Sequence, residues 1–218
     1  MKRKENGRSP VHMQPGQLPE YDIVTWVGTT VHLRPIRPAD SSALVAFHSQ
    51  LSRQSVYRRY FFMHTELSAA EVERLTRVDC PDRVAYVAWV DGELVGVGRY
   101  DRSPGTTEAE VAFVVADTFH HHGIATLLLE LLTDIALGNG ITTFFALTLV
   151  ENRDMLHVFK DMGFVVNTEL DNGTIGVRFC IAPNETSRSR RAARHAARSS
   201  GPCEASSEAI YADRSSSA

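Results

Sequence analysis

A strand, a helix and a second strand follow one another over residues 108–150, and this order constrains the fold of the 218-residue chain most strongly. The stretch EAEVAFVVA from Glu108 is extended and apolar, whereas the run from Gly123 to Leu137 repeats its apolar residues at helical spacing. A second extended run, ITTFFALTLV, begins at Ile141. Two strands joined by a crossover helix lie parallel in one sheet, with the helix against a face of that sheet. The segment therefore predicts an α/β fold.

Strand patterns on both sides of this segment extend the predicted sheet. The runs RVAYVAWV and ELVGVGRY flank Asp91-Gly92, a two-residue hairpin signal, and with the strand from Glu108 they predict an antiparallel meander. The stretch TTVHLRP before them and a hairpin over residues 165–181 add further strands. We expect a mixed, mostly antiparallel central sheet with helices on both faces.

Helices are predicted before the meander and after the crossover unit. Asp40 is expected to cap a helix over residues 41–51, and a second helical stretch covers residues 53–62. Ser68 and Glu71 have the spacing of a capping box ahead of a third helix. The stretch ENRDMLHVFKDMGF predicts a last short helix before the final hairpin.

Both ends of the chain differ in composition from the middle. Residues 1–23 are polar and contain prolines, and residues 183–218 are rich in Ser, Ala and Arg with almost no large apolar side chain. Such segments bury too little apolar surface to fold, so we expect a flexible arm and a disordered tail around one domain over residues 24–182. The stretch RSRRAARHAAR could instead form a short basic helix that touches nucleic acid or a membrane, although no apolar face accompanies its charges.

The overall charge gives no reason to expect nucleic acid or a membrane as a partner. The net charge is -3, and the hydrophobic share of 43% is that of a protein with a substantial core. No uncharged apolar run approaches the roughly 18 residues of a membrane span. Cys80, Cys180 and Cys203 lie far apart without a CxxC spacing, which argues against a disulfide framework and a zinc ribbon. We expect a protein of the reducing cytoplasm.

Three consecutive histidines, His120 to His122, precede the crossover helix, where the first backbone N–H groups have no partner inside the helix. Gly123 and Ala125 leave this helix start open, so a phosphate group could reach the N–H groups there, and the helix dipole favours negative charge. The alternative is close packing of the helix on a strand, for which small residues are equally suited. A metal site is disfavoured, because consecutive side chains in a turn diverge and cannot converge on one ion.

The order of elements and three local motifs together resemble the GNAT superfamily of acyl-CoA N-acyltransferases over residues 31–181. The superfamily's pyrophosphate motif, Gln/Arg-x-x-Gly-x-Gly/Ala, falls on HHHGIA, with His120 where Gln or Arg is usual. The other two landmarks are a short helix that follows Asn152 and ends in Gly-Phe, and the opening strand and turn LRPIRPAD. More narrowly, LSRQSVYRRYFF and AEVAFVVAD look like the catalytic domain of Pat-type protein lysine acetyltransferases.

The resemblance implies an N-acetyltransferase that uses acetyl-CoA as co-substrate and needs no metal. A backbone N–H group near Phe113, Val114 or Val115 would stabilise the oxyanion on the thioester carbonyl. The residues that would hold the pyrophosphate are His120, His121, His122, Gly123, Ile124, Ala125 and Thr126. Asn152 would contact the pantetheine arm or order the loop, although Asn is equally suited to cap the following helix.

Glu110 corresponds in this resemblance to the general base of the Pat-type domain. The attacking amine is mostly protonated at neutral pH, so a base must take a proton, and a carboxylate whose pKa burial has raised would suit the task. Taken by itself, a glutamate on a strand is more often a solvated surface residue, and Glu108 shares its side of the strand. The last short helix has no tyrosine to protonate the leaving thiolate, which leaves His157 and solvent as alternatives.

A protein lysine is the first expectation for the acceptor, and a small amine such as an amino acid or aminoglycoside is the second. The acceptor cleft is expected between residues 53–62 and the last hairpin. A further hypothesis is a non-catalytic acyl-CoA-binding sensor, because His120 and the missing tyrosine depart from the superfamily pattern. Pat-type domains often accompany a cyclic-nucleotide-binding or an acyl-CoA-ligase-like domain, and we expect neither in 218 residues.

Overall fold

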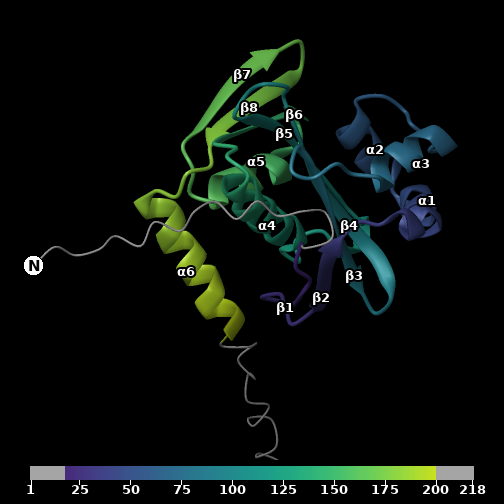
Figure 1. Ribbon diagram of the computed structural model, residues 1–218, viewed down its shortest axis with the longest axis horizontal. Coiled ribbons are helices and arrows are strands. Elements are labelled where there is room, and N and C mark those ends of the chain that lie inside the picture. The colour runs from purple at the N-terminus through teal and green to yellow at the C-terminus, as the bar shows by residue number, and fades with distance from the viewer. Residues whose placement is uncertain (1–17, 200–218) are drawn as a thin grey trace, which may run out of the picture.

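The computed structural model describes residues 18–199, and within them one mixed sheet carries helices on both faces (Figure 1). Its eight strands, in the spatial order β1-β2-β3-β4-β5-β6-β8-β7, are β1 (Tyr21–Val24), β2 (Thr30–Pro35), β3 (Arg83–Val90), β4 (Glu93–Arg102), β5 (Glu108–Val115), β6 (Thr143–Leu149), β7 (Val166–Asp171) and β8 (Thr174–Cys180). The helices are α1 (Ser41–Gln50), α2 (Arg53–Tyr60), α3 (Ala69–Thr76), α4 (Ile124–Gly138), α5 (Arg153–Asp161) and α6 (Glu185–Ser199), with short 3-10 turns η2 (Pro38–Asp40) and η3 (Asp117–Phe119). The predicted fold class is confirmed.

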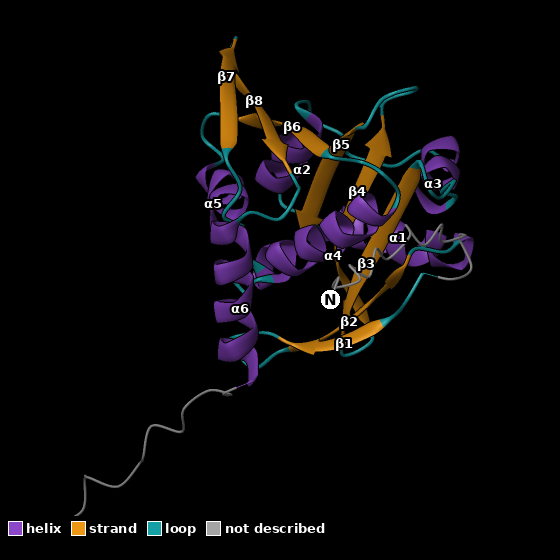
Figure 2. Ribbon diagram, turned by 60° about the vertical axis from the view of Figure 1, so that its left-hand side comes forward, coloured by secondary structure: helices purple, strands orange, loops and turns teal. Residues whose placement is uncertain are grey.

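The helices form two layers with the sheet between them. Figure 1 shows α1, α2 and α3 beside one face and α4, α5 and α6 beside the other, and Figure 2 shows α4 lying across the strands. Side chains of β3 alternate accordingly. Val84 and Tyr86 belong to the larger core under α4, whereas Ala85 and Val87 belong to a smaller core under α1 and α3. Burial on both faces explains the nearly continuous apolar sequence of this strand.

All neighbouring strands pair antiparallel except β5 and β6, which are parallel as the crossover helix requires. The parallel pairing is short, because residues 108–110 face residues 143–145 and the register stops there. Strand β5 runs on to Val115 and β6 to Leu149. The two strands therefore separate in the middle of the sheet and leave a gap between them.

Helix α6 occupies part of the tail that the sequence predicts as disordered, so that expectation is wrong here. Arg191 donates two hydrogen bonds of 2.6 Å to Asp134 of α4, and Arg194 donates one of 2.7 Å to Glu130 of the same helix. Arg194 also donates to the backbone carbonyl of Asp161, at the end of α5, over 2.7 Å. The sequence pattern missed α6 because charge-assisted hydrogen bonds, rather than an apolar face, attach it to the domain.

The folded part of the chain also begins earlier than Val24, where the sequence predicts its start. Leu18 is buried, and the Tyr86 hydroxyl donates a 2.8 Å hydrogen bond to the carbonyl of Pro19. Strand β1 then pairs with β2 at the edge of the sheet, and its four residues are too few for a visible alternation. The rest of the predicted arm and tail, residues 1–17 and 200–218, lies outside the described residues.

The predicted capping box of α3 is confirmed, whereas the predicted cap of α1 is wrong. Ser68 and Glu71 bond reciprocally to each other's backbone N–H groups. Asp40 stands at the N-cap position of α1, but its side chain makes no capping bond and accepts hydrogen bonds of 2.6 and 2.8 Å from Arg34. Burial raises the pKa of the Asp40 carboxyl, but the bonds from Arg34 and from the Arg37 backbone outweigh it and hold that pKa below its usual value. An ion pair thus fixes the turn from β2 into α1.

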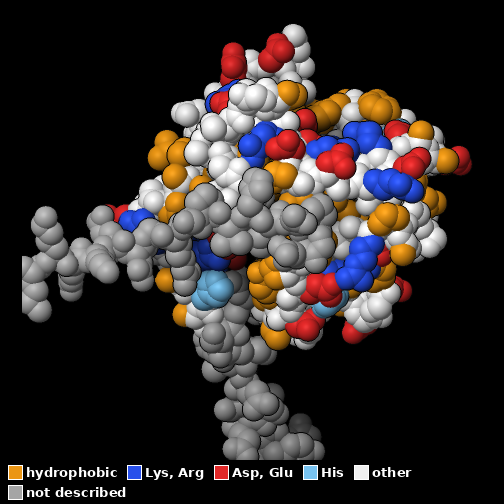
Figure 3. All heavy atoms as spheres, viewed as in Figure 1, with side chains coloured by type: hydrophobic (Ala, Val, Ile, Leu, Met, Phe, Trp, Pro, Cys, Tyr) orange, Lys and Arg blue, Asp and Glu red, His pale blue; other side chains and the backbone are white. Residues whose placement is uncertain are grey.

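Charged side chains of both signs are mixed on the surface. Figure 3 shows blue and red groups interspersed with apolar ones on the visible face, so this face carries no extended field of one sign. Within residues 18–199, no helix is both long and apolar enough to cross a membrane. The same residues hold no group of three or more His, Cys, Asp or Glu side chains that could bind a metal ion.

Candidate active site

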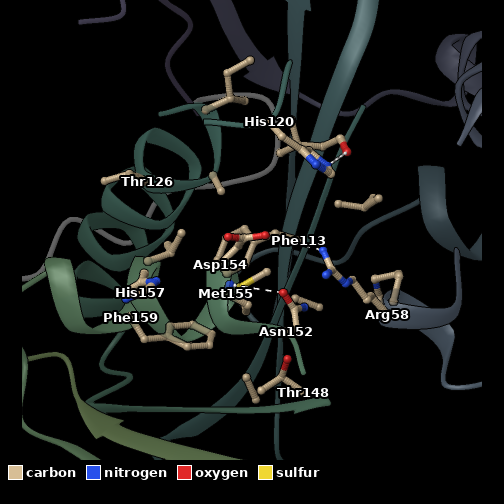
Figure 4. Close-up of a pocket in the computed structure, with 18 of the residues that line it drawn as sticks. Arg58, Phe113, His120, Thr126, Thr148, Asn152, Asp154, Met155, His157 and Phe159 are labelled. Carbon is tan, nitrogen blue, oxygen red and sulfur yellow. Dashed lines mark hydrogen bonds and ion pairs between the residues drawn. The ribbon is translucent and has the colours of Figure 1, made fainter. Parts of the chain in front are cut away.

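A cavity of about 500 Å³ lies where β5 and β6 separate. Its walls come from these two strands, from α2 and α5, and from the turn and first residues of α4. Figure 4 shows Arg58 reaching in from α2, with Asn152, Asp154 and His157 on the side of α5. Because α2 and α5 lie on opposite faces of the sheet, the cavity connects the two faces through the gap.

The turn before α4 forms an open helix start, as the sequence predicts. Gly123 is the N-cap residue with φ of +82°, and residues 123–126 all line the cavity. The first N–H groups of this 15-residue helix therefore lack helical partners at the cavity wall. A Cβ at position 123 would lie 3.2 Å from Cδ1 of Trp26, so glycine suits this position both for its φ and for the space. Such a helix end favours an anion.

The three histidines point in different directions. His120 lines the cavity, and its Nε2 lies 3.0 Å from the carbonyl oxygen of Val115, so this nitrogen carries the hydrogen and is already occupied. His121 is exposed and also lines the cavity. His122 does not line it, because its Nδ1 lies 3.4 Å from the Thr29 hydroxyl and its ring packs on Phe119. The predicted place of His122 at the pyrophosphate is therefore wrong, and this side chain instead joins the turn to the β1–β2 loop.

Residues of β5 alternate between bonding their backbone groups to β4 and directing them toward β6, and this alternation decides which N–H groups face the gap. Ser103 N–H donates to Glu108 O and Ala116 N–H donates to Val95 O, which fixes the bonded pairs between β4 and β5 at even-numbered residues of β5. The N–H of Val114 then points to β4, whereas those of Phe113 and Val115 point toward β6. Because β6 has moved away at this level, these two N–H groups face the cavity. Val114 lines the cavity as well, but its N–H belongs to the ladder with β4, which leaves Phe113 and Val115 as the candidate donors of the predicted stretch.

Glu110 lies on the opposite face of the sheet from the open helix start. Along β5, Val111 and Phe113 pack in the core under α4, whereas Val114 packs in the core under α1 and α3. Glu110 is four residues from Val114 and therefore lies on the same face as Val114 by strand alternation. Glu110 lines the cavity but is exposed, so the expected burial of this carboxylate is not found. Glu108 also lies on this strand, but its carboxylate binds Arg178 and does not line the cavity.

Charged side chains of β3, β4 and α2 lie on the same face of the sheet as Glu110. Asp101 of β4 stands opposite it in the register, and its carboxylate is bound by Arg83 at 2.8 Å and by Arg99 at 3.0 Å. Arg59 of α2 lines the cavity as well. Burial lowers the pKa of the Arg59 guanidinium, while the charges of Glu110 and Asp101 raise it, so these groups act on one another electrostatically. Arginine remains protonated in either case.

Helix α5 contributes residues that the sequence assigned and residues that it missed. The Asn152 side chain accepts a 3.3 Å hydrogen bond from Met155 N–H, which makes it the N-cap of α5, and the residue is buried in the cavity wall. Asp154 forms a 3.5 Å ion pair with Arg58 of α2 across the gap. This pair was missed because nothing in the sequence indicates that two residues so far apart in the chain meet. His157 lines the cavity, as its predicted role requires.

An open helix start beside two separating parallel strands, with a carboxylate on the far face, has the features of an enzyme site rather than of a purely structural cavity. The sequence profile of the acetyltransferase (GNAT) family matches residues 53–164, about half of the chain. The chain belongs to this family, and it is a transferase by this membership.

Individual relatives agree with the family assignment. An acetyltransferase of Pseudomonas aeruginosa is 30% identical over 67% of this chain and 81% of its own length. The acetyltransferase Pat of Mycolicibacterium smegmatis is 28% identical over 73% of this chain, which spans 48% of that relative. The crystal structure of the GNAT domain of S. lividans PAT superposes with a TM-score of 0.70 and 37% identity, covering 74% of this chain and 96% of that one.

A more distant neighbour shows the same fold with a bound ligand. RimJ of Mycobacterium smegmatis, solved in complex with CoA-disulfide, has a TM-score of 0.61 at 20% identity and covers 84% of this chain and 98% of its own. At this identity the likeness shows the fold alone.

Proposed function

We propose that this protein transfers the acetyl group of acetyl-CoA to the side-chain amine of a protein lysine, with Glu110 as general base. The observation that carries the proposal is the position of Glu110. It lines the far side of a cavity whose near side is the open start of α4, and only the gap between β5 and β6 separates the two. Acetyl-CoA and the amine can therefore approach the same point from opposite faces of the sheet.

Acetyl-CoA would bind on the α4 face. The N–H groups of residues 123–126 would hold the pyrophosphate, which the helix dipole and the glycine at the N-cap favour. His121 is exposed beside them and would add a donor, whereas His120 has its Nε2 occupied by Val115. The pantetheine arm would then run along β5, past the α5 N-terminus with Asn152 in its wall, and would bring the thioester into the gap.

We assign a group to each step of the proposed transfer. Glu110 would take a proton from the protonated amine, directly or through water, and the free amine would attack the thioester carbonyl. The N–H groups of Phe113 and Val115, which face the gap, would stabilise the oxyanion that forms. When the C–S bond breaks, the nitrogen would release its remaining extra proton to water, the thiolate would take a proton from His157 or from solvent, and the acetyl group would remain on the amine as a neutral amide.

A protein lysine is favoured as the acceptor by the likeness to the Pat enzymes and by the shape of the acceptor side. Leu147 of the cavity wall is an exposed apolar side chain, and so are Tyr57 of α2 and Phe62 and Met63 just after α2. An apolar rim suits the flanking residues of a polypeptide better than it suits a small polar amine. The cytoplasm is the compartment we propose, on the spacing of the three cysteines in the sequence.

The role of Glu110 is tested by Glu110→Gln, which keeps the size of the side chain but removes the basic carboxylate. We expect the rate of CoA release with a lysine peptide to fall by about 10² to 10⁴ at neutral pH while the affinity for acetyl-CoA stays unchanged. The deficit should shrink at high pH, where more of the amine is already deprotonated. Glu108→Gln is the matched control, because Glu108 is on the same strand and binds Arg178 outside the cavity. Full activity of Glu110→Gln would refute the assignment.

The acceptor is identified by incubating the protein with labelled acetyl-CoA and either a cell lysate or a panel of small amines. Label on lysine side chains of proteins supports the proposal. Label on small amines alone would overturn the lysine acceptor but not the transferase. Binding of acetyl-CoA in calorimetry without release of free CoA for any amine would instead indicate a sensor.

A further inference from the structure

The hydroxyl group of Thr148 is buried in the cavity wall and has no hydrogen-bond partner within residues 18–199. Thr148 lies on β6, is 1% exposed and lines the cavity. Its Oγ1 makes no hydrogen bond to any group of the described residues. Figure 4 shows this hydroxyl directed from β6 toward Asn152 at the start of α5. It is a polar atom at a place where residues 18–199 offer no hydrogen-bonding partner.

A buried hydroxyl without a partner destabilises a folded protein, because it has given up its hydrogen bonds to water. Valine has the same shape and would avoid this penalty, so folding alone gives no reason for threonine here. An unmet hydrogen-bonding group in the wall of a binding cavity is satisfied when a ligand supplies the partner. Threonine can donate one hydrogen bond and accept others, so it fits an amide, which has both a donor and an acceptor.

The position of Thr148 along β6 indicates which part of a ligand it would meet. Phe144 and Ala146 of β6 pack in the core under α4, and Thr148 follows them on the same face by strand alternation. This is the face of the open helix start, on the acetyl-CoA side of the gap. The parallel register, in which residue 108 faces residue 143, brings Thr148 to the level of Phe113, five residues further along both strands.

We propose that the Thr148 hydroxyl binds an amide of the pantetheine arm of acetyl-CoA close to the thioester. The inference rests on acetyl-CoA binding in this cavity, as proposed above. A change of the threonine rotamer turns the hydroxyl to another staggered position about the Cα–Cβ bond, so the oxygen can be directed at the ligand without movement of the backbone. The ligand then removes the unmet hydrogen bond that the free protein carries.

Thr148→Val and Thr148→Ser test this role. The valine variant keeps the shape and loses the hydroxyl, so we expect its affinity for acetyl-CoA in calorimetry to be about fivefold weaker, the effect of one ordinary hydrogen bond. Its melting temperature without ligand should rise by about 2–4 °C, because the unmet hydroxyl is gone. The serine variant keeps the hydroxyl and should bind within about twofold of the wild type.

The chain supplies a matched control in Thr133 of α4. This residue is 5% exposed, its Oγ1 also has no partner among the described residues, and it does not line the cavity. Thr133→Val should raise the melting temperature similarly and leave the affinity for acetyl-CoA unchanged. Adenosine 3′,5′-diphosphate, which lacks the pantetheine arm, should compete equally well for the wild type and for Thr148→Val.

The outcomes separate this inference from the function on which it rests. Unchanged acetyl-CoA affinity of Thr148→Val would overturn the role of Thr148 while leaving the transferase intact. An equal loss of affinity for adenosine 3′,5′-diphosphate would overturn it too, because the hydroxyl would then act at a distance from the arm. A wild-type protein that binds no acetyl-CoA would overturn the proposed function itself.

Discussion

The open start of α4 makes a quantitative prediction about charge at position 123. Gly123→Asp and Gly123→Asn place side chains of nearly equal size at a residue with φ of +82°, 3.2 Å from Trp26. Both substitutions should lower the stability of the fold by a similar amount, about 1–2 kcal/mol, because each puts a side chain at a positive φ. Asn and Asp are the residues that tolerate this conformation best after glycine. Their difference in ligand affinity therefore isolates the charge.

A carboxylate at this position would stand next to the pyrophosphate held by the N–H groups of residues 123–126. Two like charges about 4 Å apart repel by about 1 kcal/mol in water and by more in a partly desolvated cavity. With more than one negative charge on the ligand, we expect Gly123→Asp to bind CoA at least about tenfold more weakly than Gly123→Asn, or about 1.4 kcal/mol.

Calorimetric titration with CoA at low and at high salt measures this difference, and thermal unfolding verifies that both variants fold. The gap between the two variants should narrow at high ionic strength, because salt screens charges near the surface. Equal affinities, or a gap that salt does not change, would refute the reasoning and place the phosphates elsewhere.

Two further predictions concern the ties between elements. Arg194→Ala should lower the free energy of unfolding by about 1.5–3 kcal/mol, since it removes charge-assisted bonds to the buried Glu130 and to Asp161. Arg191→Ala breaks a half-exposed ion pair and should lower the free energy of unfolding by under about 1 kcal/mol. Equal losses for the two variants in denaturant titrations would contradict the burial argument. Burial raises the pKa of the Asp117 carboxyl, but the hydrogen bonds from Ser52 and Ser55 outweigh it and leave that pKa below its usual value. The stability added by the ionised Asp117 carboxylate is present above about pH 4 and is lost as the pH falls. The melting temperatures of wild type and Asp117→Asn should therefore differ at neutral pH and converge in acid. A difference that persists in acid would contradict the role of the charge.

The sequence predicted those features of the fold that local chemistry determines. The hairpin at Asp91-Gly92, the capping box at Ser68 and the parallel pair on either side of α4 are all confirmed. Each depends on residues close together in the chain or on the geometry of a crossover. A basic helix in the region of α6 was only the alternative to a disordered tail, because the partners that stabilise α6 lie on α4 and α5 and no periodic apolar face indicates the helix.

Some features of the candidate site could be predicted from local sequence, and others depend on the arrangement of the whole sheet. The open helix start at Gly123 and the cap at Asn152 follow from local sequence and are found in the cavity wall. The direction of a side chain from an irregular turn does not follow from sequence, which is why His122 was misplaced. The Arg58–Asp154 ion pair and the unmet hydroxyl of Thr148 depend on which strands separate, and that is a property of the whole sheet.

The alternation of β5 explains how a single strand can serve both substrates of a transferase. Side chains alternate between the two faces, which puts Glu110 on the α2 side, while the backbone groups of Phe113 and Val115 point along the sheet into the gap. A slip of one residue against β4 would reverse both at once, moving Glu110 to the acetyl-CoA side and turning these N–H groups toward β4. The seven-residue register with β4 and the ion pairs of Asp101 opposite Glu110 hold the strand against such a slip. The proposed base and the proposed oxyanion donors are therefore positioned by the same hydrogen-bonded ladder, and a change that shifts β4 should impair both.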